Sequence, residues 1–155
     1  MKKITLTQIY NELQEIKKRL PPEEIKSAFK YDKTKDGWTL VETNKPLVMN
    51  FKKLELVSFL KDKEESITGE EMRKRAVELK ANLGQVEAEW LEEHQDKIPE
   101  SWRNSYLVLP ATLWRDSGGH LRVPYLYWFG ERWGLSWRWL ENDWYSFVRL
   151  VRLCG

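Results

Sequence analysis

Tryptophan is concentrated in the last third of this chain. Seven of the nine tryptophans fall within residues 102–144. So much apolar ring area is unfavourable in water, and the alternation of apolar residues at 133, 135, 137 and 139 is typical of one face of a β-strand. The sequence therefore predicts an aromatic-rich sheet in this region. The ring residues expected in its core are Trp133, Trp137 and Trp139.

Four strand-like runs follow residue 101. They cover residues 106–114, 121–129, 132–140 and 145–153. The connectors at 116–119, 130–131 and 141–143 are short enough for hairpins, and Pro110 and Pro124 require edges or bulges. These features predict an antiparallel β-meander or a small open barrel.

The first helix has its start encoded in the sequence. Thr5 is a good N-cap, Gln8 stands where a capping-box partner is needed, and Pro21 ends the segment. The apolar residues then repeat at spacings of three and four. They are Leu6, Ile9, Leu13, Ile16 and Leu20. We expect this seam to dock on the protein's own core, with self-association or partner binding as the alternatives.

The segment after this helix is more ambiguous. Residues 38–41 and 47–51 are apolar runs separated by a polar stretch that contains Pro46, which predicts a hairpin at 38–51. Residues 54–60 fit either a third strand or a short helix, because their apolar period is compatible with both.

Thr68 gives the clearest helix start in the chain. Glu71 follows it by three residues, and the apolar residues that come next predict a helix as far as Leu83. Gly84 is expected at a left-handed position after that helix, and residues 86–95 form a second helix. Glutamates on the second helix would repel phosphate, so a DNA-reading helix-turn-helix is disfavoured.

Together these elements predict an α+β fold. N-terminal and central helices precede a C-terminal antiparallel β-meander or small open barrel. Residues 1–100 are expected to be mainly helical, with the possible hairpin at 38–51, and residues 101–155 to form a sheet rich in Trp and Arg. We expect both regions to fold as one cooperative unit, because 155 residues suit a single domain.

Composition excludes several classes of function. The net charge of +2 does not demand an anionic partner, and the single cysteine, Cys154, excludes an internal disulfide. His94 and His120 lack the ligand spacing of a metal site, and no glycine-rich phosphate loop is present. We therefore expect no metal and no cofactor, and a non-enzymatic role is favoured. No apolar run reaches the length of a membrane span, so a cytoplasmic protein without membrane contact is expected.

The polar positions between the tryptophans are the best candidates for binding. Gly134, Ser136 and Arg138 share the face opposite the tryptophans, and Gly134 would leave room for a partner. Aromatic residues occupy both faces of the strand at 121–129, so some should meet solvent or a partner. The candidate binding residues are Arg122, Trp128, Phe129, Gly134, Ser136, Arg138, Tyr145 and Phe147.

These residues predict a binding module that presents a Trp/Arg-rich sheet surface to a protein or peptide. The alternative is single-stranded nucleic-acid binding. In that case Trp128, Phe129 or Tyr145 would stack on bases. The residues that would contact phosphates are Arg122, Arg138 and Arg149.

Two groups of short motifs stand out within residues 69–152. The central group is Gly69-Glu70-Glu71-Met72, Arg75-Ala76, Ala81-Asn82-Leu83-Gly84-Gln85 and Glu93-His94-Gln95-Asp96-Lys97-Ile98-Pro99. The tail group is Val123-Pro124-Tyr125-Leu126-Tyr127-Trp128, Arg132-Trp133, Trp139-Leu140 and Arg149-Leu150-Val151-Arg152. With these motifs the chain resembles a family of small uncharacterised proteins with Trp-rich tails from uncultured, small-genome bacteria. The family has no assigned activity, so the resemblance implies no functional residue. It allows a third interpretation, a diversified ligand-display protein in which tail positions vary between constant tryptophans.

Overall fold

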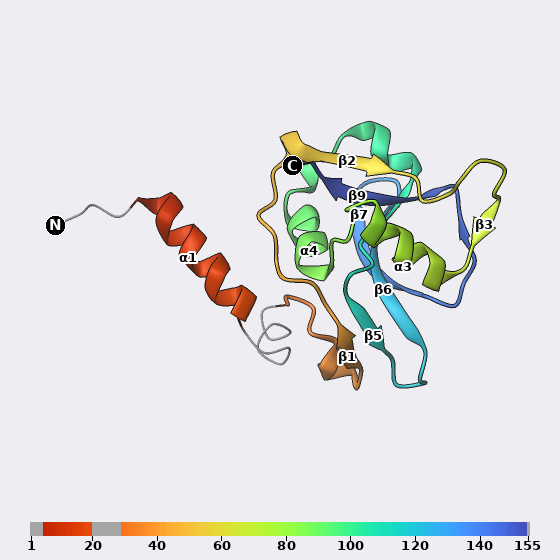
Figure 1. Cartoon of the computed structure of the whole chain (residues 1–155), viewed down its shortest axis with the longest axis horizontal. Helices are drawn as coiled ribbons and strands as arrows, with labels where there is room; N and C mark the ends of the chain where they lie inside the picture. Colours follow the sequence, from red (N-terminus) through yellow and green to blue (C-terminus); the bar gives the residue numbers. More distant parts are fainter. Residues whose placement is uncertain (1–4, 20–28, 155) are drawn as a thin grey trace.

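The computed structural model describes residues 5–19 and 29–154. In this part of the chain a seven-stranded mixed sheet forms the centre of the molecule (Figure 1). Its order is β1 (Thr39–Glu42), β5 (Leu113–Arg115), β6 (Leu121–Trp128), β4 (Tyr106–Val108), β9 (Val148–Leu153) and β2 (Leu54–Val57), and β7 (Trp133–Trp139) pairs with β6. A separate two-stranded sheet joins β3 (Ser66–Ile67) to β8 (Trp144–Tyr145).

The α+β class with strands in the C-terminal region is confirmed. The pairing is mostly antiparallel, but β4 and β9 run parallel, with Leu107 beside Arg149. Two strands from before residue 100 also join the sheet, because β1 pairs with β5 and β2 pairs with β9. Both halves of the chain therefore contribute strands to one sheet.

The α-helices of the described chain are α1 (Leu6–Arg19), α3 (Gly69–Glu78) and α4 (Gln85–Glu93). The predicted start signals are present. Thr5 and Gln8 exchange backbone-to-side-chain hydrogen bonds at 2.9 and 3.1 Å. The hydroxyl of Thr68 accepts a hydrogen bond from the Glu71 N–H at 3.2 Å. Short 3₁₀ turns lie at Lys33–Asp36, Phe51–Lys53, Gln95–Lys97 and Glu100–Asn104.

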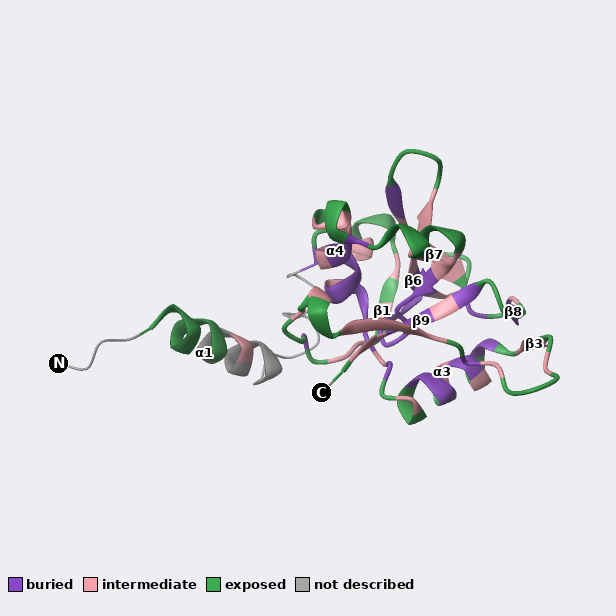
Figure 2. Ribbon diagram, turned by 90° about the horizontal axis from the view of Figure 1, so that it is seen from above, coloured by how far each residue is buried: buried purple, intermediate pink, exposed green. Residues whose placement is uncertain are grey.

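Each face of the sheet has its own apolar core. Met72 and Ala76 of α3 pack on one face with Val123 and Leu150. Ala88 and Leu91 of α4 pack on the other, with Leu107, Leu109, Leu126, Trp133 and Val151. Because side chains alternate along a strand, β4, β6 and β9 supply residues to both cores. Figure 2 shows buried residues, in purple, on both α3 and α4.

Helix α1 extends away from the sheet and its helices (Figure 1). Leu6 is 85% exposed, and Ile9 and Tyr10 are each 44% exposed. The expected docking of this seam on the protein's own core is therefore wrong for Leu6 and Ile9. The side chains of Leu13 and Ile16, and all of Leu20, fall outside what the structure describes.

The predicted hairpin at 38–51 does not form. Thr39 and Leu40 of β1 pair instead with Arg115 and Trp114 of β5, and residues 43–50 contain no strand. Local patterning suggested a hairpin, but an apolar run can pair with any available strand edge, and β5 supplies one from far along the chain. Residues 54–57, in contrast, form one of the two predicted alternatives, the strand β2.

Gly84 has a different role from the one predicted. Helix α3 ends at Glu78, and Lys80 takes the left-handed conformation with a φ of 56°. Gly84 is the extended N-cap of α4, with a φ of −131°. A Cβ at this position would come within 2.2 Å of the Asn44 side chain and 2.4 Å of the Thr112 side chain. Glycine is needed here for a close approach rather than for a turn.

Glu87 is fully buried in the first turn of α4. Its Oε1 accepts hydrogen bonds from the Gly84 N–H at 3.0 Å and from the Asn44 side-chain amide at 2.5 Å. Burial raises the pKa of this carboxyl to about 7, although these hydrogen bonds oppose the rise. The carboxyl therefore keeps a proton at mildly acidic pH that it would lose in the unfolded chain.

Replacing Thr68 with Ala should lower the free energy of unfolding by about 1 kcal/mol, because the Glu71 N–H loses its acceptor. Urea denaturation measures the loss. Thr68→Ser keeps the hydroxyl and should stay close to the wild type. Equal losses in the two variants would show that the cap does not stabilise α3.

Glu87 should make stability depend on pH. The pKa of Glu87 in the folded protein lies above its unfolded value of about 4.3. The stability that the protonated carboxyl contributes is therefore fully present below about pH 4.3, and it is lost as the pH rises through the folded pKa of about 7. Urea denaturation from about pH 5 to pH 8 should show Glu87→Gln gaining stability relative to the wild type. A difference that stays constant over this range would contradict the assignment.

Candidate binding surface

The pairing of β6 with β7 creates an aromatic area on the α3 side of the sheet. Tyr125 stands opposite Ser136, and Tyr127 stands opposite Gly134. The core beneath α3 includes Val123 and Leu140, at one end of these two strands. Tyr125 packs against this core, and the rings of Tyr127 and Phe129 continue from it along the strand.

Six aromatic residues form a connected area that we call the aromatic surface. They are Tyr106, Tyr125, Tyr127, Phe129, Tyr145 and Phe147. Each ring lies within 6.2 Å of at least one other member, centre to centre. Phe129 is 50% exposed, Tyr145 42% and Phe147 43%. Large rings that contact one another and still face solvent are characteristic of interaction sites.

Tyr106 connects the two parts of this surface. Its ring lies 5.4 Å from that of Tyr125 and 5.3 Å from that of Phe147, in the second case edge to face. The parallel pairing of β4 with β9 makes this possible, because it places Tyr106 beside Val148. Rings from three separate segments of the chain are thereby held in one area.

Arg138 lies at the Phe147 end of the aromatic surface. Its guanidinium carbon is 5.5 Å from the Trp144 ring centre and 6.0 Å from that of Phe147, within cation–π range. Its Nε is buried without a hydrogen-bond partner. At the opposite end, the guanidinium of Arg132 lies 5.7 Å from the Phe129 ring centre.

The Tyr125 hydroxyl, on the aromatic surface, has a raised pKa. Burial raises the pKa of Tyr125, while a hydrogen bond with Ser136 and the positive charge of Arg138 act in the opposite direction. The phenol therefore stays neutral at physiological pH and can donate a hydrogen bond.

The structure places six of the eight predicted binding residues on this side of the sheet. They are Phe129, Gly134, Ser136, Arg138, Tyr145 and Phe147. Arg122 and Trp128 belong to the opposite face. Trp128 packs against Trp133 and the guanidinium of Arg103, and Arg122 forms an ion pair with Asp116 at 2.7 Å. The predicted set is therefore divided between two surfaces.

Gly134 does not leave the open space that was expected. A Cβ there would approach Phe129 to 2.8 Å and Tyr127 to 3.3 Å. The two rings lie over the glycine, so its lack of a side chain lets the aromatic surface close rather than admitting a partner.

Sequence reasoning missed Tyr106, Tyr125 and Tyr127. The alternation of Tyr125 and Tyr127 with Phe129 already placed these three on one strand face, so a signal for them was present. Nothing local indicates Tyr106, because its neighbours on the surface come from strands far along the chain.

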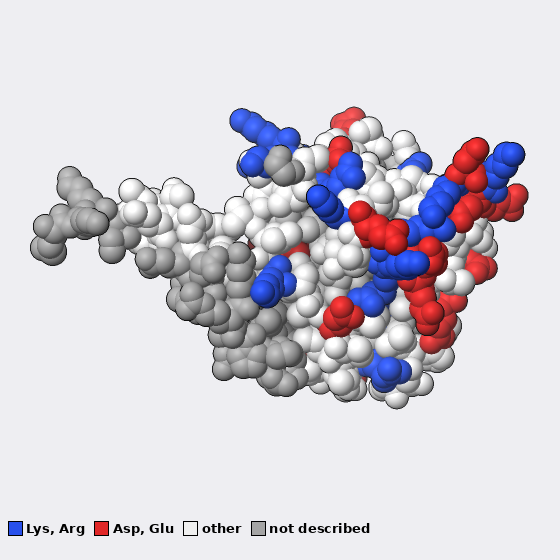
Figure 3. Space-filling view, viewed as in Figure 1, with Lys and Arg blue, Asp and Glu red and all other residues white. Residues whose placement is uncertain are grey.

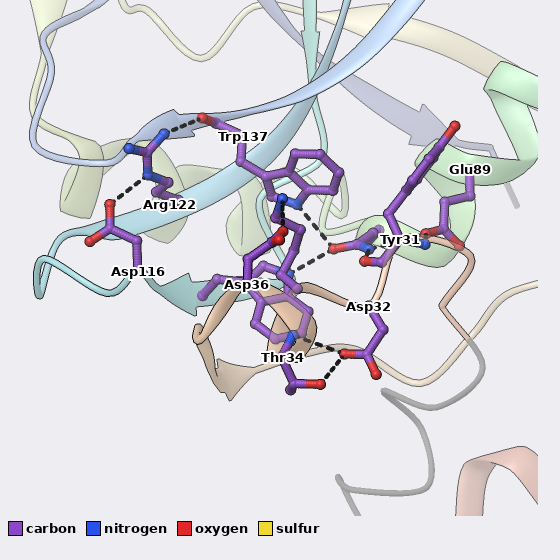
Figure 4. Close-up of polar contacts among 11 residues, drawn as sticks. Tyr31, Asp32, Thr34, Asp36, Glu89, Asp116, Arg122 and Trp137 are labelled. Carbon is purple, nitrogen blue, oxygen red and sulfur yellow. Dashed lines mark hydrogen bonds and ion pairs between the residues drawn. The ribbon is translucent and has the colours of Figure 1, made fainter.

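On the opposite face, Trp137 is the centre of a second cluster (Figure 4). Its indole N–H donates to the side-chain oxygen of Gln85 at 3.1 Å, and the Tyr31 ring meets its ring edge-on. The ammonium of Lys33 lies 4.6 Å from the Trp137 ring centre and 4.4 Å from that of Trp38. Asp36 pairs with the same ammonium at 2.6 Å. These contacts are made within the chain, so the cluster packs the N-terminal segment, residues 29–38, onto the sheet.

The expectation that all three alternating tryptophans lie in the core is only partly correct. Trp133 is fully buried and Trp137 is half-buried, but Trp139 is 41% exposed. The Trp139 ring stacks on His120 at 4.7 Å, near the turn that joins β5 to β6. The strand register is as expected, but the core beneath α4 does not extend to this end of β7.

A hollow of about 340 Å³ lies beside α3 and is a weaker candidate. Leu113, Leu121 and Leu140 are among the apolar residues that line it. The charged Arg73 at its rim already bonds the Pro110 carbonyl and Glu42. Figure 3 shows bases and acids intermingled over this side of the molecule.

No family model matches the chain, and comparisons with curated proteins and with solved structures also find no match. Within residues 5–19 and 29–154, no three His, Cys, Asp or Glu side chains are grouped to hold a metal ion. None of the helices described is both long and apolar enough to span a membrane.

Trp137 and Trp139 provide a matched test of the second cluster. Trp137→Ala should lower the free energy of unfolding by about 3 kcal/mol, since it removes a packed ring and a hydrogen bond. Trp139→Ala should cost about 1 kcal/mol, because that ring is already partly in water. Chemical denaturation of both variants measures the difference, and equal losses would contradict the assigned packing.

Proposed function

We propose that this protein is a non-enzymatic binding module that holds a peptide segment of a protein partner against the aromatic surface. One observation carries the proposal. Phe129, Tyr145 and Phe147 remain 42–50% exposed within a connected set of rings, of which Tyr106 and Tyr125 also pack against the core beneath α3. Burying such rings against a partner removes apolar area from water with little loss of side-chain entropy.

The support beneath the surface favours recognition by a preformed site. Tyr125 and Tyr127 come from β6, which pairs with β7 from Arg122 to Trp128. The reverse side of β6 packs against α4 through Leu126. A sheet braced in this way holds its surface residues in place, which reduces the ordering cost of binding.

Single-stranded nucleic-acid binding receives less support from the geometry. The rings of Phe129 and Tyr145 lie on the α3 side, whereas Trp128 and Arg122 belong to the opposite face. Arg149 pairs with Leu107, whose side chain packs under α4, so it also belongs there. One strand of nucleic acid could not contact all of these residues on one surface.

The cytosol suits the proposed module, because Cys154 is an exposed free thiol.

Selection of random peptides displayed on phage tests the proposal. Peptides selected on the wild type should lose affinity by about tenfold or more for Phe147→Ser, and further for the triple variant with Phe129→Ser and Tyr145→Ser. Fluorescence polarisation measures the dissociation constants.

Val77→Ser is the matched control, since Val77 is a 61% exposed apolar residue on α3 outside the aromatic surface. It should leave peptide affinity within about twofold of the wild type. Selected peptides that bind the triple variant as tightly as the wild type would refute the proposal. Salt-sensitive binding of oligothymidine, lost in the triple variant, would favour the nucleic-acid alternative instead.

A further inference from the structure

Arg138 differs from three other partly or fully buried arginines of the described chain, whose guanidinium groups each pair with a carboxylate. Arg75 pairs with Glu64 at 2.6 Å, Arg122 pairs with Asp116 at 2.7 Å, and Arg152 pairs with Glu55. Arg138 is also partly buried, but no carboxylate of the described residues pairs with it. Asp143, the acid that precedes Trp144 in the chain, accepts a hydrogen bond from the Tyr145 hydroxyl at 3.4 Å.

The guanidinium of Arg138 also lacks hydrogen bonds. Its Nε is covered by protein and has no partner. The terminal nitrogens have no acceptor among the described residues either, and they are not among the covered unpartnered atoms, so they reach solvent. The terminal nitrogens are therefore the donors that an incoming acceptor can reach, and a hydrogen bond from a charged donor is stronger than one between neutral groups.

The rings around Arg138 stabilise its charge without using its donors. Trp144 and Phe147 offer their π-systems to the cation, at 5.5 and 6.0 Å. The N–H groups of a guanidinium lie in its own plane and form a fork that matches the two oxygens of a carboxylate. The position therefore combines a fixed cation, free donors and an apolar wall.

Resting on the proposed function, we infer that Arg138 is the anion-binding residue of the aromatic surface. The partner segment then carries a carboxylate beside an aromatic or other apolar side chain. The carboxylate binds the terminal nitrogens of Arg138, and the apolar group packs on Phe147 and its neighbours.

A carboxylate fits better than a phosphate. Phosphate recognition by proteins typically uses clustered arginines. Here Arg132 lies at Phe129, which is the other end of the aromatic surface from Arg138. A single guanidinium suits a singly charged carboxylate.

Two small probes that differ only in charge test the inference. N-acetyl-phenylalanine carries a carboxylate beside an aromatic ring, and N-acetyl-phenylalaninamide is its neutral analogue. Titrations followed by NMR, observing the Arg138 side-chain N–H and the Trp144 indole, give the dissociation constants. The wild type should bind the acid about tenfold or more tightly than the amide.

Arg138→Gln should remove the preference for the acid, and Arg138→Lys should retain part of it. Arg122→Gln, which alters a paired arginine on the opposite face, should leave the preference unchanged. A thermal melt of Arg138→Gln checks the fold, which should be intact because the arginine has no ion pair to lose.

The remaining outcomes separate this inference from the proposed function. Equal binding of acid and amide, weakened by Phe147→Ser, would overturn the anion site and leave the aromatic surface supported. An acid preference that survives in a folded Arg138→Gln would also overturn it, because the anion then binds elsewhere. Failure of both probes to bind the wild type would overturn it as well, while the peptide selection still decides the proposed function.

Discussion

The arrangement of the fold depends most on the hydrogen bonds of the Gln85 side chain. This side chain is fully buried, and its oxygen accepts hydrogen bonds from the indoles of Trp114 at 2.7 Å and Trp137 at 3.1 Å. Its amide nitrogen donates to the Tyr31 carbonyl and to Glu89, at 2.7 and 3.0 Å. One amide thereby joins α4 to β5, to β7 and to the N-terminal segment. A buried polar network with every group paired is rigid and specifies a single arrangement.

This network gives the two faces of the sheet different roles. On the α4 side, Glu89 accepts hydrogen bonds from the N–H groups of Lys30 and Tyr31, so the N-terminal segment is fastened over Trp137. On the α3 side, Phe129, Tyr145 and Phe147 remain 42–50% exposed. The closed face holds the sheet in shape, and the open face keeps its aromatic residues available.

Features set by neighbouring residues could be predicted from the sequence. The caps at Thr5 and Thr68 depend on contacts three residues away, and the alternation along β6 and β7 follows from strand geometry. The faces of Gly134, Ser136 and Arg138 were therefore correct. Features set by distant residues could not be predicted. The pairing of β1 with β5, the close approach that requires Gly84, and the exposure of Trp139 all depend on segments far away in sequence.

The position of β9 has a consequence for the order in which the chain can assemble. This strand lies between β4 and β2, and it is the partner with which β2 pairs in the sheet. During synthesis, β2 emerges long before β9 and must wait unpaired, with its strand edge accessible to other chains. The sheet can close only once Val148–Leu153 has been made. Ribosome-bound intermediates of this protein should therefore be at risk of aggregation, and chaperone binding to the waiting strand would protect them.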